Sequence, residues 1–234
     1  LMAMLAYKDL EMDMLTSPMA MGMMPADHKF TTRSKGFGDV KLSALWNVHK
    51  TAQSSLHATI GMGIPTGSIK QKDDNAMGVR ARMPYMMQLG SGTYDPILGL
   101  TYFNKQNQWA YGAQTLNTFR LGKNDQGYQL GNEYTATTWV GVNMSHTISW
   151  SLRLDAKAWQ DIDGEDDALD PMMAPTARTD LRGGERLDGL VGLNYQHSSG
   201  HRLALEFGVP LHQDLDGPQM ETDYSVMLGW QYAP

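Results

Sequence analysis

Charged side chains stand at every second position in several segments, and this spacing suggests either an ion path or an ion-pair network. In an extended strand, alternate residues point to the same face. Rings of charge around a pore set ion preference, whereas paired charges fill and stiffen a small barrel. Because the two signs are nearly balanced, we interpret most of these residues as a network along a pore and expect modest selectivity. The predicted pore-lining residues are Arg153, Asp155, Lys157, Arg186, Asp188, Arg202, Glu206, Glu221 and Asp223.

A glycine-rich segment at residues 88–95 has the composition of a phosphate-binding loop. It lacks the Lys-Ser/Thr ending and the following helix that a P-loop needs. Glycine permits tight turns, and an aspartate can hydrogen-bond the backbone of its own loop. We therefore predict an external loop that turns here into the next strand and folds into a pore mouth. The predicted constriction residues are Gly90, Ser91, Gly92, Tyr94 and Asp95.

Methionine is concentrated near the start of the chain, where eight of the 18 methionines fall within the first 24 residues. Thioether sulfurs select Cu(I) or Ag(I), and alternate spacing in an extended segment places several sulfurs on one side. Met86-Met87 adds a further pair of thioethers in another long loop. The alternative is adaptable apolar filling by loops that pack over a pore or meet lipid. Capture of Cu(I) or Ag(I) is therefore a second candidate function. Its predicted ligands are Met12, Met14, Met19, Met21, Met23 and Met24.

The pair His197-Ser198 is the one candidate for hydrolysis, as in an outer-membrane lipase. A nucleophilic serine needs a base and an orienting third group at the lipid-facing outer rim. We place this pair in a short periplasmic turn and expect no enzyme activity. The histidines show no His-Glu-x-x-His spacing, and the chain has no cysteine, so we predict neither a zinc hydrolase nor any other cofactor.

The overall composition excludes further classes of function. The 234 residues contain 19 Lys and Arg against 25 Asp and Glu, a net charge of −6, so no basic face for nucleic acid is expected. No run of about 18 apolar residues occurs, so we expect no transmembrane helix. We expect one domain over residues 1–234, which begins inside a strand and shows no signal peptide.

Period-two alternation recurs along the whole chain, whereas helical periodicity is hard to find. The clearest case is a segment in which Ile148, Trp150 and Leu152 alternate with polar or charged residues. Most candidate strands are as long as the about 9–11 residues that a tilted strand needs to cross a bilayer. The candidate strands are residues 1–9, 38–48, 55–65, 92–104, 108–121, 133–144, 148–159, 185–197, 202–209 and 221–232.

The links between these strands alternate strictly between long and short. The long links are Leu10–Phe37, Thr66–Ser91, Gly122–Asn132, Asp161–Gly184 and Leu211–Met220. Bacterial outer-membrane barrels have short periplasmic turns and long external loops. The alternation therefore favours an all-β, antiparallel up-and-down transmembrane barrel of about ten strands. A soluble β-sandwich or lipocalin-like barrel is the alternative, but such folds use shorter strands and bury their apolar face.

Several stretches also resemble one known family. They are FTTRSKGFGDVKL at 30–42, GIPTGSI at 63–69, MQLGSGTYDPILGLTY at 87–102, LGKNDQGYQLG at 121–131, GGERLDGLVGLNY at 183–195 and LALEFGVPLHQDLDGPQ at 203–219. In order and spacing they resemble the outer-membrane channel family described as "putative MetA-pathway of phenol degradation". The resemblance implies a monomeric barrel of about twelve strands with inward-folded loops and a narrow channel. It also implies passage of hydrophobic or aromatic compounds.

The chain departs from the pattern of this family at both ends. Residues 1–9 resemble an internal strand, so the first two strands are expected to be missing, and the chain does not finish on an aromatic residue. The prediction is an outer-membrane channel in contact with outer-membrane lipid, through which a small-molecule solute passes passively.

Overall fold

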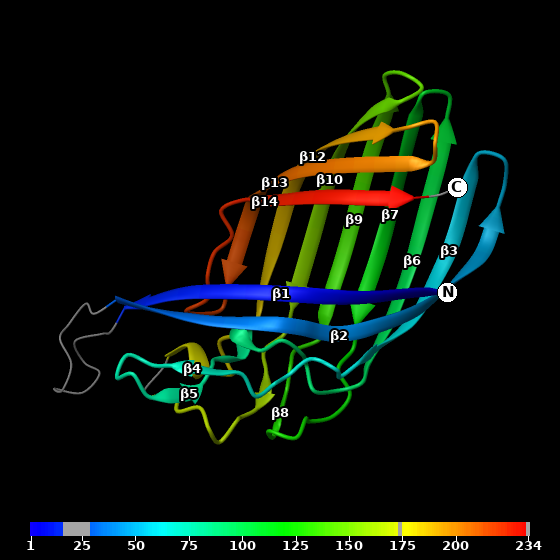
Figure 1. Cartoon of the computed structure of the whole chain (residues 1–234). Coiled ribbons are helices and arrows are strands. Elements are labelled where there is room, and N and C mark those ends of the chain that lie inside the picture. Colours follow the sequence, from blue (N-terminus) through cyan, green and yellow to red (C-terminus); the bar gives the residue numbers. More distant parts are fainter. Residues whose placement is uncertain (16–28, 173–174, 233–234) are drawn as a thin grey trace.

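The computed structural model describes residues 1–15, 29–172 and 175–232. Ten strands form one antiparallel sheet in the order β1-β2-β3-β6-β7-β9-β10-β12-β13-β14, so each strand pairs with its neighbours along the chain (Figure 1). The strands are β1 (Met2–Leu15), β2 (Lys29–Lys50), β3 (Ser54–Ile64), β6 (Asp95–Gln106), β7 (Trp109–Thr118), β9 (Glu133–Asn143), β10 (Ile148–Trp159), β12 (Gly184–Gln196), β13 (His201–Leu215) and β14 (Ser225–Tyr232). The up-and-down order and the predicted ten strands are confirmed.

The long links gather at one end of the sheet and the short turns at the other (Figure 1). We call these the loop end and the turn end. The loop end carries two small hairpins, β4 (Lys72–Asp74) with β5 (Arg80–Arg82) and β8 (Tyr128–Gln129) with β11 (Asp163–Gly164). Two 3-10 turns, η1 (Tyr85–Met87) and η2 (Pro175–Ala177), lie in the same links. None of the described residues forms a helix of the length and apolar character needed to cross a membrane.

The first predicted long link, Leu10–Phe37, is wrong over most of its length. Strand β1 continues to Leu15 and β2 begins at Lys29, and these two residues pair at the far end of the hairpin. The physical reason lies in ion pairs on the exposed face of this extension. Lys29 lies 2.7 Å from Asp13, and Arg33 of β2 donates to a Glu11 carboxylate oxygen of β1 over 2.8 Å. Such cross-strand pairs of opposite charge support a ladder beyond the membrane segment.

The two faces of the sheet differ in polarity as an outer-membrane strand requires. On β10 the side chains of Trp150, Leu152 and Leu154 are exposed, whereas Arg153 and Asp155 between them are partly buried. The exposed face is therefore the apolar one, the reverse of a soluble sheet. This arrangement contradicts the soluble alternative, because about half of each of these apolar side chains faces outward.

The sheet curls so that β1 and β14 come round in front of the middle strands (Figure 1). Among the described residues no ladder joins β1 to β14, so the sheet is a curled half-barrel rather than a closed ring. Both edge strands pair on one side only, and their outer edges present backbone groups without strand partners.

Candidate functional site

The inner face of the curled sheet holds two cavities that strand β10 connects. The first has a volume of about 500 Å³ and lies near the turn end, where Ser149, Ser151 and Arg153 of β10 line it. The second has a volume of about 450 Å³ and lies below the loops, where Lys157 and Trp159 line it. Because all five residues share the inner face of one strand, the two cavities follow one another along the sheet.

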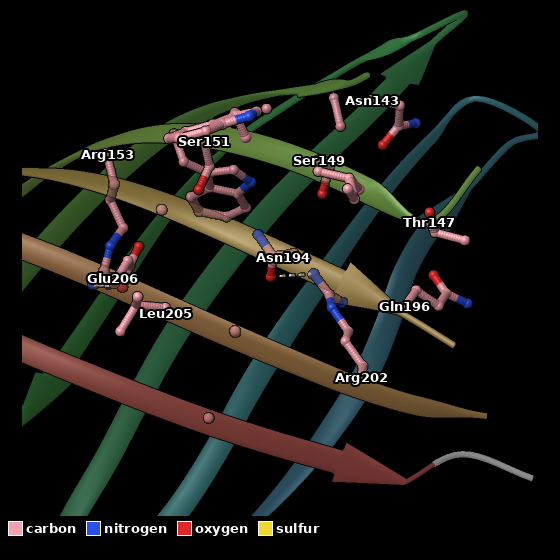
Figure 2. Close-up of a pocket in the computed structure, with 18 of the residues that line it drawn as sticks. Asn143, Thr147, Ser149, Ser151, Arg153, Asn194, Gln196, Arg202, Leu205 and Glu206 are labelled. Atoms are coloured by element: carbon pink, nitrogen blue, oxygen red, sulfur yellow. Dashed lines mark hydrogen bonds and ion pairs between the residues drawn. The ribbon is translucent and has the colours of Figure 1, made fainter. Parts of the chain in front are cut away.

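In the first cavity the predicted Arg153 and Glu206 form an ion pair (Figure 2). An Nη atom of Arg153 on β10 lies 2.5 Å from a carboxylate oxygen of Glu206 on β13, so the pair spans β12. Gly192 of β12 makes this possible, because a Cβ there would lie 3.1 Å from Cγ of Glu206 and overlap the Ser151 hydroxyl. The predicted network between strands is therefore present at this position.

Arg202 lies closer to the turn end and has no acidic partner among the described residues. Its guanidinium donates to the side-chain oxygen of Asn194 over 3.0 Å (Figure 2). Both residues line the first cavity. Arg202 therefore contributes positive charge to this cavity, in contrast to the neutralised Arg153.

Two predicted carboxylates lie directly opposite one another on β10 and β12. Asp155 is the register partner of Asp188, an arrangement that would be destabilising if neither were compensated. Thr137 donates its hydroxyl to Asp155. Arg186 donates to Asp188 over 3.0 Å. Neither aspartate lines either cavity, so the compensated pair lies between them along the strands.

The second cavity contains the remaining predicted residues of the inner face, Lys157 and Arg186. Lys157 lies 3.3 Å from a carboxylate oxygen of Glu133 and 5.7 Å from the centroid of the Trp159 ring. Glu133 also accepts from Arg120 over 2.8 Å. A chain of alternating charges thus runs from Arg120 in the β7–β9 link over β9 to β10 at the base of the loops.

The predicted constriction segment is fixed against the sheet by hydrogen bonds. Asp39 accepts from the backbone N–H of Ser91 over 2.8 Å and from its hydroxyl over 3.0 Å. The Ser91 hydroxyl also contacts Asp95, which is buried and paired with Arg120. Gly90 approaches Asp39 and the Gly67 backbone so closely that no Cβ would fit. Tyr94 alone points outward, 60% exposed, and the constriction role of the segment stays a prediction.

Part of the predicted metal site lies outside the described residues, namely Met19, Met21, Met23 and Met24. Met12 is buried in an apolar cluster with Met83 and Met87, and Met14 and Met86 pack against this cluster. The methionines of β1 and of the β3–β6 link therefore come together at the loop end. This packing agrees with apolar filling, and capture of a soft metal ion stays a prediction.

Glu221 and Asp223 do not lie on a strand. The last strand begins at Ser225, and both acidic residues are exposed in the preceding link. The Gln213 side chain reaches across from β13, donating to the backbone carbonyl of Thr222 over 3.0 Å and accepting from its N–H over 2.9 Å. These bonds hold the segment as a loop, so the predicted strand 221–232 is wrong at its start.

His197 and Ser198 lie in the short turn between β12 and β13, as predicted. The hydroxyl that contacts His197 belongs to Ser199, 2.6 Å from Nδ1, and the Ser199 backbone N–H donates to the same nitrogen over 3.2 Å. These contacts close a turn over two residues, which is the local role of Ser in such links.

The sequence reasoning missed Asp39, Arg120, Glu133 and Arg182. Glu133 carried a usable pattern, because it begins an alternation with Thr135 and Thr137 whose side chains share the inner face. Arg120 and Arg182 lie in links, where no periodicity marks them, and Asp39 lies in the middle of β2. Their partners are distant in sequence, as with Asp39 and Ser91, which are 52 residues apart.

Comparison with solved structures shows the same fold in an outer-membrane protein. The COG4313 outer membrane channel from Pseudomonas putida F1 superimposes with a TM-score of 0.59 at 16% identity, over 85% of this chain and 66% of the channel. The chain thus spans slightly less than two thirds of that channel's length. OmpT, an outer membrane protein of Vibrio cholerae, gives a TM-score of 0.47 at 10% identity, over 83% of this chain and 54% of OmpT. No curated protein matches the chain.

The fold and the apolar outer face both place the protein in the outer membrane, in contact with its lipid. The sequence itself identifies the family. A family model matches residues 7–179, which is more than half of the chain, and its description agrees with the resemblance drawn from the sequence motifs. The chain belongs to the family described as "Putative MetA-pathway of phenol degradation".

Proposed function

We propose that the protein is an outer-membrane channel through which small solutes diffuse passively along the inner face of the sheet. This proposal is carried by the two cavities that follow one another along β10 on the polar inner face of the sheet. The outer face of the same strand is apolar. Polar solutes need such a route, because the surrounding lipid offers no hydrogen bonds.

The inner face sets size and a weak charge preference. Most charges there are neutralised by a neighbour, as Arg153 is by Glu206 and Lys157 by Glu133. Paired charges leave little net field for an ion, so we expect modest selectivity. The segment fixed by Asp39 narrows the loop end, and no step of the proposed mechanism makes or breaks a covalent bond.

The solutes are small and include hydrophobic or aromatic compounds. This finer statement is supported by the family description, which refers to phenol degradation, and by aromatic side chains at the inner face, such as Trp139 in the first cavity and Trp159 in the second. We propose that the channel acts as a monomer, because one chain supplies the residues that line both cavities.

Soft-metal capture is the alternative function and has less support. Of the six predicted sulfur ligands, Met12 and Met14 are the ones that the structure describes, and both pack with apolar neighbours. Packing alone explains why these side chains are there.

Single-channel recording in a planar bilayer tests the proposed function. The full chain should give discrete, stable conductance steps. In Glu206→Gln the Arg153 charge is left unpaired, so the reversal potential in a salt gradient should shift toward anion preference; Arg153→Gln should shift it toward cations. Glu11→Gln is the matched control, because it breaks the exposed pair between Glu11 and Arg33 outside the cavities. It should change neither the conductance nor the reversal potential. A folded, inserted chain that conducts no ions would contradict the proposal.

A further inference from the structure

The second cavity has an excess of positive charge. Three cationic side chains line it, Lys157, Arg182 and Arg186, against one acidic residue, Glu133. Lys157 is paired with Glu133, and Arg186 is paired with Asp188. Arg182 is therefore the cation of this cavity whose charge is not matched by a carboxylate within ion-pair distance among the described residues.

Arg182 is 6% exposed, so this charge is buried. Its Nε donates to the Leu181 carbonyl over 3.0 Å and one Nη to the Pro218 carbonyl over 2.9 Å. The other Nη atom, Nη1, is buried and has no hydrogen-bond partner in the described part of the chain. The Asp161 carboxylate accepts instead from the backbone N–H groups of Arg182 and Gly183, over 2.7 and 2.6 Å.

Two other largely buried arginines of the loop end have a carboxylate within ion-pair distance. Arg82 lies 3.5 Å from Asp166, and Arg120 is paired with Asp95 and Glu133. A buried guanidinium without an anion is costly, because charged groups lose hydration on burial. Burial lowers the pKa of Arg182, yet a guanidinium remains charged at neutral pH. An anion bound in the cavity would supply the missing counter-charge.

Apolar and aromatic side chains form part of the other walls of the cavity, together with Gln160 and Gln219. Tyr85, Leu130 and Ile162 line it beside Trp159. The Trp159 indole N–H donates to the Arg182 carbonyl over 2.8 Å, which holds the ring and the backbone of the arginine together. A volume of about 450 Å³ is within the range of small-molecule sites. One cationic donor beside apolar walls fits a ligand with one anionic end and an apolar body.

We propose that the second cavity is a binding site for small organic carboxylates with an apolar or aromatic body, whose carboxylate offsets the unmatched positive charge of Arg182. Lys157 and Arg186 add positive potential around the same space, and the apolar walls contact the body of the ligand. This inference rests on the proposed function, because it names a solute class for the same route.

Benzoate binding to the full chain in detergent micelles tests the site, with benzyl alcohol as a neutral probe of similar size. Benzoate should quench Trp159 fluorescence saturably, and Trp159→Phe should remove that part of the signal. Benzoate should bind at least about tenfold more tightly than benzyl alcohol, as expected for a charge-assisted hydrogen bond in a buried site. Equal affinity for the two probes would overturn the proposal, and this comparison requires no substitution of the arginine.

Arg182→Gln should weaken benzoate binding about tenfold or more, and Arg182→Lys should weaken it less. Arg178→Gln is the matched control, because Arg178 lies in the same link, is exposed and pairs with Asp180; it should bind benzoate like the unchanged chain. Equal loss in both glutamine variants would overturn the proposal. Conductance without benzoate binding would leave the channel standing and refute the site. Benzoate binding that depends on Arg182, in a chain that conducts no ions, would support the site and refute the channel.

Discussion

Tyr85 and Tyr128 are two buried tyrosines at the loop end, and they differ in whether the hydroxyl group has a hydrogen-bond partner. Tyr85 and Tyr128 pack edge to face with 4.7 Å between ring centroids. The Tyr85 hydroxyl accepts from the Asp166 backbone N–H over 3.0 Å, whereas the Tyr128 hydroxyl is buried without a partner in the described structure. Burial raises the pKa of Tyr128 to about 12, so it remains a neutral phenol at neutral pH.

These two residues give a prediction with its own control. Tyr85→Phe should lower the free energy of unfolding by about 1–3 kcal/mol, because it leaves the buried Asp166 N–H without an acceptor. Tyr128→Phe should change it by less than about 0.5 kcal/mol, because no bond is lost. Denaturant unfolding of both variants in the same detergent checks this. A larger loss in Tyr128→Phe than in Tyr85→Phe would show that the hydrogen bonding has been misassigned.

At the scale of elements, one carboxylate fastens the β3–β6 link to the sheet. Asp39 of β2 accepts from the Gly67 N–H at the start of this link and from Ser91 at its end. Asp39→Ala should free both ends, so trypsin should cleave at Arg80 within the link several-fold faster. Asp13→Ala removes an exposed carboxylate that pairs with Lys29 on the β1–β2 hairpin and should leave this rate unchanged. Equal cleavage in both variants would mean that other contacts hold the link.

The elements that the sequence predicted well are those that cross the membrane. In β10 and β12 an apolar side chain faces outward at nearly every second position, so alternation and length identify them. The β1–β2 extension follows the opposite rule, since Met12 faces the loops and the charged Glu11 and Asp13 face outward. A search for apolar outward faces therefore ends β1 too early and starts β2 too late.

The candidate site was predictable to the extent that it lies on regular strands. Arg153 and Glu206 were both predicted from alternation, and the structure pairs them. Arg182 has no such pattern, because it lies in a link and its partner, the Pro218 carbonyl, comes from another link 36 residues away. Contacts between links depend on how the sheet curls, which local periodicity does not contain.

At the scale of the whole molecule, the two faces of the curled sheet must meet different solvents. The outer face presents apolar side chains over β10, β12, β13 and neighbouring strands, whereas the inner face presents charges and hydroxyls. In water such an outer face would promote aggregation. In lipid it is the favourable arrangement, so insertion should depend on which face a charge is placed upon.

Leu154→Arg places a charge at the centre of the outer face of β10, where Leu154 is now 48% exposed. A charge near the bilayer midplane costs about 2–4 kcal/mol, so folding into vesicles should fall sharply. Ser149→Arg introduces the same charge on the same strand, but the residue lines the first cavity and the change should be tolerated. The folded fraction is measured as the heat-modifiable gel shift after vesicle insertion. Equal yields would mean that the apolar face of β10 does not meet lipid, and a larger loss with Ser149→Arg would reverse the assignment of the two faces.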